Sequence, residues 1–307
     1  MILVTGGLGM IGAQTARALT DLGHDAVVTA YRRAEIPAFL TDRVVVEPLD
    51  VTDRDAFLAL GSRHSISDIV HLAGSIPGED PLNYFRTDTA GLLNALEAAR
   101  QWKVRRCAVA ASLGAYIGRT EIPWHEDLEL PAAQVPHPII AFKKAVEPLA
   151  TNALQGTGVH PVVLRIGSTW GPLMDPQSPF NPIPPYISAV LRGDQPAPLH
   201  ADDGGDLCYA PDTGRAIALL VAADTLAHDT YNVSNGTPYT SRQLIQAVQA
   251  AVPGARLELR PARSSSGPGD NPYLDITRLT ADTGFTPAYD LPRAVADYVA
   301  WRADNAR

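Results

Sequence analysis

One glycine-rich segment near the start of the chain constrains its fold more than any other feature. The segment reads Thr5-Gly6-Gly7-Leu8-Gly9-Met10-Ile11-Gly12. It follows an apolar stretch at residues 2–5 and leads into residues 11–22, where apolar side chains recur at helical spacing. The first stretch predicts a buried strand and the second an amphipathic helix. A strand, a glycine turn and a helix in this order are typical of a βαβ unit in a parallel sheet.

The same turn predicts a site for a dinucleotide. Gly6 permits the tight turn, Gly9 lets the backbone approach a pyrophosphate, and Gly12 allows the helix to pack closely on the strand. The backbone N–H groups of Met10 and Ile11 lie at the start of the helix, where unpaired donors and a partial positive charge favour an anion. The alternative is a tight turn that binds no ligand.

The end of the second predicted strand, residues 26–30, indicates which dinucleotide is bound. An acidic side chain there would accept hydrogen bonds from the adenosine ribose of NAD. This chain instead has Tyr31, Arg32 and Arg33 after Ala30. Because two guanidinium groups pair well with a 2′-phosphate, we predict NADP (NADPH) as the cofactor. The alternative is two solvated surface arginines without a ligand.

Strand and helix patterns continue to alternate along the first half of the chain. Further strands are expected at residues 44–46, 69–72, 107–111 and 161–165, and helices at 83–100 and after Pro138. This alternation predicts an α/β protein with a Rossmann-type doubly wound parallel sheet and a smaller C-terminal substrate-binding region. We assign residues 1–165 to an NADP-binding domain that is completed by 206–235, and residues 166–205 and 236–307 to the substrate-binding region. Residues 172–198 are rich in proline and predict a loop-rich cap.

Composition excludes several classes of function. Of 307 residues, 46% are hydrophobic and 19% charged, as in a globular protein. The net charge of −8 argues against nucleic acid as a partner, since phosphate binding needs an excess of basic residues. No apolar stretch is long enough to span a membrane and no signal peptide precedes the first strand, so we expect a cytoplasmic protein. The two cysteines, Cys107 and Cys208, predict neither a disulfide framework nor a metal site.

Several motifs together resemble the extended short-chain dehydrogenase/reductase family, which includes nucleotide-sugar epimerases and dehydratases. Besides the glycine turn, these motifs are Leu49-Asp50-Val51, His71-Leu72-Ala73-Gly74, Arg165 to Pro172, Gly205 to Asp212, and Tyr231 to Ser234. The resemblance implies that Asp50 and Val51 lie beside the adenine. It also implies that Leu72, Ala73 and Gly74 lie beneath the cofactor.

The family's catalytic residues are only partly present. Most members use a serine that polarises the substrate oxygen, a tyrosine that transfers the proton and a lysine that holds the nicotinamide ribose. Ser112 matches the serine, and Lys143, placed by Glu147, matches the lysine. The tyrosine position is then Ile139, or Ile140 if Lys144 is the lysine. Isoleucine has no proton to give, so the family's usual mechanism cannot run in this chain.

The substrate is expected to be a small molecule. Nucleotide-sugar enzymes of this type commonly carry an arginine for the diphosphate at the position of Gly205, and its loss weakens that assignment. Five residues of the proline-rich segment either line an apolar pocket or belong to the core: Leu173, Met174, Phe180, Ile183 and Tyr186.

We therefore predict an NADPH-dependent ketoreductase that works without the tyrosine. Ser112 would donate a hydrogen bond to the substrate, Lys143 would order the ribose, and the proton would come from water, from Tyr116 or from the substrate itself. Such a protein is similar to the atypical ketoreductases of aromatic polyketide assembly. The alternatives are a sugar or polyol epimerase or dehydratase with His137 or Tyr116 as the base, and a non-catalytic NADP-binding sensor.

A homodimer is the expected assembly. Helices near residues 83–100 and 139–155 pair in many relatives, and Leu92, Leu93 and Leu96 would supply apolar surface there.

Overall fold

A central parallel sheet organises the molecule. The computed structural model describes residues 1–32, 35–178, 180–265 and 270–307. Within these ranges seven strands form the sheet, in the order β11-β6-β5-β4-β1-β2-β3, and all neighbours are parallel. They are β1 (Ile2–Thr5), β2 (Ala26–Ala30), β3 (Val45–Pro48), β4 (Asp68–His71), β5 (Arg106–Ser112), β6 (His160–Ile166) and β11 (Thr230–Val233). The predicted Rossmann-type α/β sheet is confirmed.

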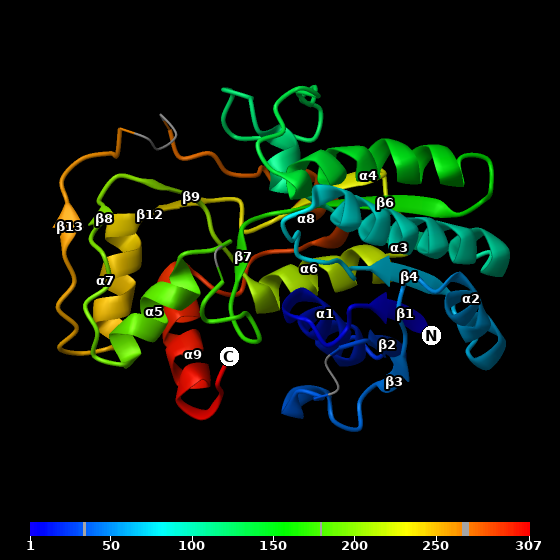
Figure 1. Ribbon diagram of the computed structural model, residues 1–307, viewed down its shortest axis with the longest axis horizontal. Coiled ribbons are helices and arrows are strands. Elements are labelled where there is room, and N and C mark those ends of the chain that lie inside the picture. The colour runs from blue at the N-terminus through cyan, green and yellow to red at the C-terminus, as the bar shows by residue number, and fades with distance from the viewer. Residues whose placement is uncertain (33–34, 179, 266–269) are drawn as a thin grey trace.

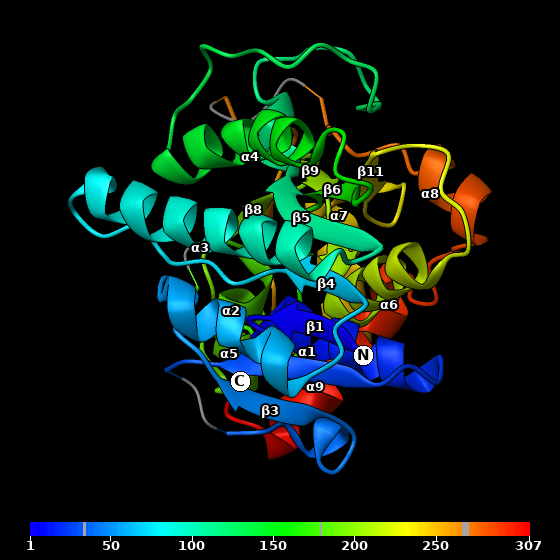
Figure 2. The same cartoon turned by 90° about the vertical axis from the view of Figure 1, so that its right-hand side faces the viewer.

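Helices cover both faces of the sheet, as Figures 1 and 2 show. On one face lie α2 (Arg54–Arg63), α3 (Pro81–Trp102) and α4 (Pro138–Leu154), and on the other α1 (Met10–Asp21), α6 (Ala210–Ala222) and α8 (Thr277–Thr283). The pleat explains this arrangement, because successive side chains of a strand point to opposite faces. Ile2 and Val4 of β1 join the core under α1 and α6, whereas Leu3 joins the core under α2, α3 and α4.

A second group of elements lies beside the sheet, at the left of Figure 1. It contains α5 (Ile183–Leu191), α7 (Ser241–Ala251) and α9 (Leu291–Asp304), with three pairs of short strands. The pairs are β7 (Thr169–Trp170) with β10 (Cys208–Tyr209), β9 (Gly204–Asp206) with β12 (Pro238–Thr240), and β8 (Leu199–His200) with β13 (Leu259–Arg260). The described residues also form two short 3₁₀ helices, η1 (Ala38–Leu40) and η2 (Leu113–Tyr116).

Some sequence expectations need correction. The proline-rich segment is not only loop, because α5 forms within it and carries prolines in its first turn, where a missing N–H costs nothing.

Leu92 and Leu96 are buried in the core of the monomer and only Leu93 is exposed, so the apolar surface expected for a dimer is smaller than predicted. The homodimer stays a prediction.

Two further observations bear on the classes excluded by composition. Among the described residues, no helix is long and apolar enough to cross a membrane. Cys107 and Cys208 are both buried and free.

Candidate functional site

The glycine turn and the end of β4 meet at the carboxyl edge of the sheet. Gly6 has a φ of +66°, and a Cβ on it would lie 2.9 Å from the backbone of Ala73. A Cβ on Gly12 would lie 2.3 Å from the carbonyl oxygen of Gly6. Side chains at either position would therefore push the turn apart, which is the physical reason for glycine there.

The first turn of α1 offers unpaired donors at this edge. Gly9 is the N-cap and its own N–H is bonded to Gly6, while no side chain caps the helix. In the described part of the chain the N–H groups of Met10, Ile11 and Gly12 have no acceptor, and no acidic residue lies in the first turn. These donors and the helix dipole suit a pyrophosphate.

A buried network joins β1 to β4 beneath the turn. The Thr5 hydroxyl accepts hydrogen bonds from the N–H groups of Leu72 and Ala73, both at 3.2 Å, and lies 2.9 Å from Nδ1 of His71. Burial, with the nearby Lys143 charge, lowers the pKa of His71 to about 3, so this imidazole is neutral at pH 7. The Thr5 hydroxyl then donates its proton to Nδ1.

Gly74 continues the same edge toward α3. A Cβ on Gly74 would lie 3.3 Å from Asp88, a buried residue of α3 that accepts hydrogen bonds from the N–H and hydroxyl of Ser75. In the sequence, Asp88 carries no signal beyond that of a carboxylate on the buried face of a predicted helix.

The region expected to contact the adenosine lies at the ends of β2 and β3. Burial acts to raise the pKa of Asp50. Hydrogen bonds from the N–H and hydroxyl of Thr52, together with the charge of Arg32, outweigh burial and hold this pKa below its ordinary value. Arg32 is exposed, and its guanidinium lies over the ring of Tyr31. Val51 lies beside α3, where its carbonyl accepts a hydrogen bond from Asn94. Arg33 lies outside the described residues.

Ser112 ends β5 at the same carboxyl edge. Its hydroxyl oxygen accepts a 3.1 Å hydrogen bond from the N–H of Gly114, so its own proton is available to another acceptor. A Cβ on Gly114 would lie 2.2 Å from Cδ1 of Ile140 and 3.5 Å from the Ser112 hydroxyl oxygen. The Ile140 side chain therefore covers Gly114 immediately beside Ser112.

The side chains of the two lysines of α4 bind different parts of the chain, and this difference indicates which of them occupies the family's lysine position. Lys143 Nζ donates to the carbonyl of Ala110, two residues before Ser112 on β5, at 2.6 Å. Lys144 Nζ donates instead to the carbonyls of Ile117 and Pro131. Burial lowers the pKa of Lys143 to about 8, against the opposing charge of Asp88. This geometry favours Lys143 as the family's lysine and Ile139 as the residue in the tyrosine position.

Tyr116 is unsuited to proton transfer. It is fully buried, stacks on Trp124, donates to Asn232 at 2.8 Å and accepts from Arg165 at 2.7 Å. Burial raises its pKa to about 12, although Arg165 opposes the rise. Because both hydrogen-bonding roles of the phenol are filled inside the protein, we interpret Tyr116 as a structural residue.

A cavity of about 490 Å³ lies among η2, α5, β8, β9 and β12. Leu113, the residue after Ser112, is part of its wall, together with residues of α5, β8, β9 and β12. Ile183 lines this cavity and is also a member of a core cluster. Leu173 and Tyr186 belong to core clusters, Met174 packs against one, and Phe180 is exposed. His200 also lines this cavity, and no motif of the sequence distinguishes it.

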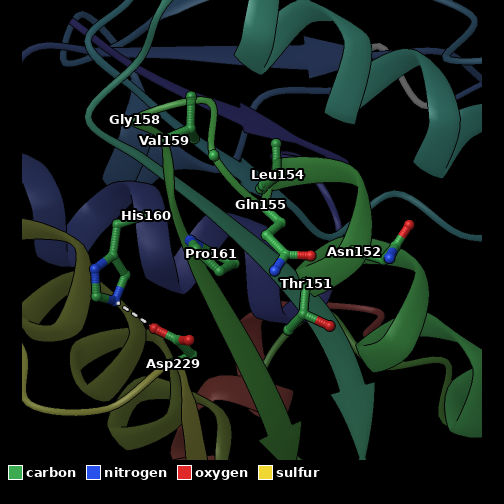
Figure 3. A pocket seen from close by; sticks show the side chains of 10 residues that line it. Thr151, Asn152, Leu154, Gln155, Gly158, Val159, His160, Pro161 and Asp229 are labelled. Atoms are coloured by element: carbon green, nitrogen blue, oxygen red, sulfur yellow. Dashed lines mark ion pairs between the residues drawn. The ribbon is translucent and has the colours of Figure 1, made fainter.

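Another cavity, of about 620 Å³, lies at the far end of the sheet (Figure 3). It is formed by the last turns of α4, the start of β6 and Asp229, which pairs with His160 at 3.2 Å. Parallel α/β proteins bind ligands at the carboxyl ends of their strands, and this cavity is at the amino end of β6. We therefore place the candidate site at the carboxyl edge, with Ser112 and with the cavity that Leu113 lines.

Comparison with known proteins places the chain in a family. The model of the NAD dependent epimerase/dehydratase family matches residues 2–234. The chain belongs to this family. Its family relatives include the UDP-glucose 4-epimerases of mouse and human, which are 27% and 26% identical and match 99% of this chain and 97% of their own length. That of Azospirillum brasilense is 33% identical over 204 residues, covering 62% of this chain and 55% of its own.

Solved structures of this family share the fold. UDP-glucose-4-epimerase from Stenotrophomonas maltophila, with bound NAD and formylated UDP-arabinopyranose, superposes with a TM-score of 0.84 at 24% identity, covering 98% of this chain and 97% of its own. The Thermotoga maritima UDP-glucose 4-epimerase, with UDP-glucose, has a TM-score of 0.82 at 21% identity and covers 100% and 99%. The expected family resemblance is thus confirmed.

Proposed function

We propose that this protein is an NADPH-dependent ketoreductase that reduces a small-molecule carbonyl without a tyrosine acid. The observation that supports it most is Ile139 at the acid position, while Ser112 and Lys143 remain at the same edge of the sheet. The family as a whole uses a nicotinamide dinucleotide, and the NAD in the Stenotrophomonas structure is in keeping with this.

The residues at the carboxyl edge fit such a cofactor. The N–H groups of Met10, Ile11 and Gly12 would receive the pyrophosphate, and the close approach of Gly6 to Ala73 leaves only backbone beneath it. Asp50 would lie at the adenine. Arg32, with Arg33, would receive a 2′-phosphate, which is why we propose NADP over NAD.

Reduction of a ketone needs a hydride and a proton. The bound dihydronicotinamide would supply the hydride. Ser112 would donate a hydrogen bond to the carbonyl oxygen, and the Lys143 ammonium would hold the nicotinamide ribose and stabilise the developing negative charge. Tyr116 is too enclosed to act, so we propose that the proton comes from water or from a hydroxyl of the substrate.

The comparisons favour a second candidate, a sugar epimerase, because the relatives described above are UDP-glucose 4-epimerases. Oxidising a sugar hydroxyl by hydride transfer requires a base that takes its proton. Ile139 cannot do this, whereas a ketone can take a proton from the solvent. For this reason we place ketone reduction first.

One experiment separates the two candidates. The protein is incubated with NADPH and a panel of cyclic and aromatic ketones, including an angucyclinone as an example of the polyketide class, and NADPH fluorescence is followed. In parallel, UDP-glucose is incubated with the protein and analysed by NMR. We expect NADPH to be consumed in proportion to alcohol formed and UDP-glucose to stay unchanged. Formation of UDP-galactose without net consumption of cofactor would favour the epimerase, and no turnover in either arm would favour a non-catalytic sensor.

A further inference from the structure

Asp88 is a buried carboxylate to which the proposed reaction gives no role. It lies on α3 and is only 6% exposed. A carboxylate is rarely buried unless hydrogen bonds or an opposite charge compensate for the loss of water. Its neighbours in space are Gly74 and Ser75, which follow β4, so Asp88 lies at the carboxyl edge of the sheet.

Hydrogen bonds join Asp88 to the segment that follows β4. Its Oδ1 accepts from the N–H of Ser75 at 2.9 Å and from the Ser75 hydroxyl at 2.6 Å. Its Oδ2 lies 3.3 Å from the position that a Cβ on Gly74 would take. The family resemblance implies that Gly74 lies beneath the cofactor. Asp88 therefore fixes the path of the backbone at that point.

The charge of Asp88 also acts on Lys143. The helices that carry these two residues, α3 and α4, pack against each other. Burial lowers the pKa of Lys143 to about 8, and the charge of Asp88 opposes this fall. The hydrogen-bond partner of Lys143 Nζ, the carbonyl of Ala110, is neutral and cannot replace a counter-charge.

Among the described residues, the other ionisable groups around α4 are neutral or paired elsewhere. His71 at the end of β4 is neutral, and burial keeps the Tyr84 phenol of α3 neutral by raising its pKa. Glu147 of α4 pairs with Arg165 of β6 at 2.8 Å. The same holds for four further residues on α4 and the elements packed against it: Arg106, Cys107, Tyr116 and Lys144.

We propose that Asp88 is a positioning residue of the cofactor site, which fixes the segment after β4 through Ser75 and is the counter-charge that keeps Lys143 protonated for the nicotinamide ribose. The proposal rests on the proposed function for the contact between Lys143 and the cofactor. Because Asp88 acts through these two residues, its replacement changes the affinity for the cofactor and the pH dependence of that affinity.

NADPH binding measured as a function of pH tests the role of the charge. NADPH is titrated into the full chain between about pH 7 and 9.5 and its fluorescence is followed. In this range the 2′-phosphate stays ionised, since phosphate monoesters lose their second proton near about pH 6. The affinity should fall with a midpoint at about pH 8, where Lys143 loses its proton. In Lys143→Met the affinity should be lower and independent of pH, which identifies the titrating group.

Asp88→Asn keeps an oxygen that accepts from Ser75 but removes the charge. The midpoint should move down by about one pH unit, as expected for the loss of a neighbouring opposite charge. The dissociation constant should then rise about twofold at pH 7 and about fivefold at pH 8, because only the protonated fraction binds well. Asp88→Glu, which keeps the charge, should stay near the original midpoint. Asp88→Ser, a smaller uncharged variant, has the same expected shift and replaces Asp88→Asn if that variant does not fold.

Two controls separate the charge from the hydrogen bonds. Ser75→Ala removes one hydrogen bond and leaves the carboxylate, so the dissociation constant should rise by about two- to tenfold at every pH with an unchanged midpoint. Glu97→Gln removes the same charge from α3. Because Glu97 is exposed and pairs with Arg54, this variant should change neither the midpoint nor the affinity.

Three results would overturn the proposal: an unchanged midpoint in the uncharged Asp88 variants, an equal shift in Glu97→Gln, or NADPH binding to the unmodified protein that is absent or does not vary with pH. If the binding results agree with the proposal but no ketone is reduced, the ketoreductase assignment fails and the role of Asp88 stands.

Discussion

The Lys143 ammonium is expected to lower the stability of the cofactor-free protein. Burial lowers its pKa from 10.5 to about 8, and its hydrogen bond to the Ala110 carbonyl is with a neutral acceptor. Below pH 8 both the folded and the unfolded chain hold this proton, so the full cost of burying the charge is present. As the pH rises from about 8 to 10.5 the folded protein loses the proton before the unfolded chain does, and the cost disappears. Since one pKa unit corresponds to about 1.4 kcal/mol, the shift of about 2.5 units corresponds to a cost of at most about 3.5 kcal/mol.

Lys143→Met tests this reasoning. Without cofactor, the variant should be more stable than the unmodified protein by about 1–3 kcal/mol at pH 7, and the difference should vanish near pH 10.5. Urea unfolding at a series of pH values measures it. Lys103→Met is the control, because Lys103 is exposed at the end of α3, and its effect should stay within about 0.5 kcal/mol. Equal stabilities at pH 7, or a gain that does not change with pH, would refute the argument.

The same variant should bind NADPH less well. A charge-assisted hydrogen bond contributes about 1.5–3 kcal/mol, so the dissociation constant should rise by about 10- to 100-fold at pH 7. Fluorescence titration with NADPH measures this change. A variant that gains stability and keeps its affinity would show that Lys143 does not contact the cofactor.

Four further predictions concern the site. Ser112→Ala should lower kcat for ketone reduction by about 10²-fold or more, as loss of an oxyanion donor does. Tyr116→Phe should leave kcat within about threefold but lower the free energy of unfolding by about 1–3 kcal/mol, because it leaves buried hydrogen-bonding groups unpaired. Equal losses of kcat in Ser112→Ala and Tyr116→Phe would contradict these roles. Replacing Arg32 and Arg33 with Ala should raise the dissociation constant for NADPH by about tenfold or more and hardly change that for NADH; tighter binding of NADH by the unmodified protein would exclude the NADP assignment. Ile139→Tyr should not raise ketone turnover in steady-state assays, because a phenol that finds no hydrogen-bond partner there costs about 1–3 kcal/mol. A large gain in turnover would show that the site has merely lost its acid.

Features that depend on neighbours in the sequence were predictable. The glycine turn, β1 and α1 follow from the spacing of Gly6, Gly9 and Gly12 and from the periodicity that follows them. Such signals are local because a turn conformation and an apolar helix face are properties of a few consecutive residues. The absence of a tyrosine four residues before Lys143 is local in the same sense.

The cavity was not predictable, because it is assembled from segments far apart in the chain. Leu113, Ile183, His200 and Tyr239 lie on four different elements, and no periodicity connects them. The surroundings of Tyr116 were not predictable for a related reason. Its position near Ser112 in sequence suggested a proton donor, but its hydroxyl faces Asn232 and Arg165, whose positions are set by other strands.

The structure also shows what surrounds the two isoleucines that could stand in place of the tyrosine. Two isoleucines occupy the two registers of the motif, and the structure gives them different surroundings. Ile139 packs on the core cluster beneath α3 and α4, and Ile140 covers Gly114 beside Ser112. Because a larger residue at 114 would collide with Ile140, the glycine and the isoleucine form one apolar surface next to the serine hydroxyl. A substrate that reaches Ser112 would therefore contact the hydrocarbon of Ile140, one residue after the position at which most family members present a phenol. Under the proposed ketoreductase function, this contact favours an apolar ketone independently of how the proton arrives.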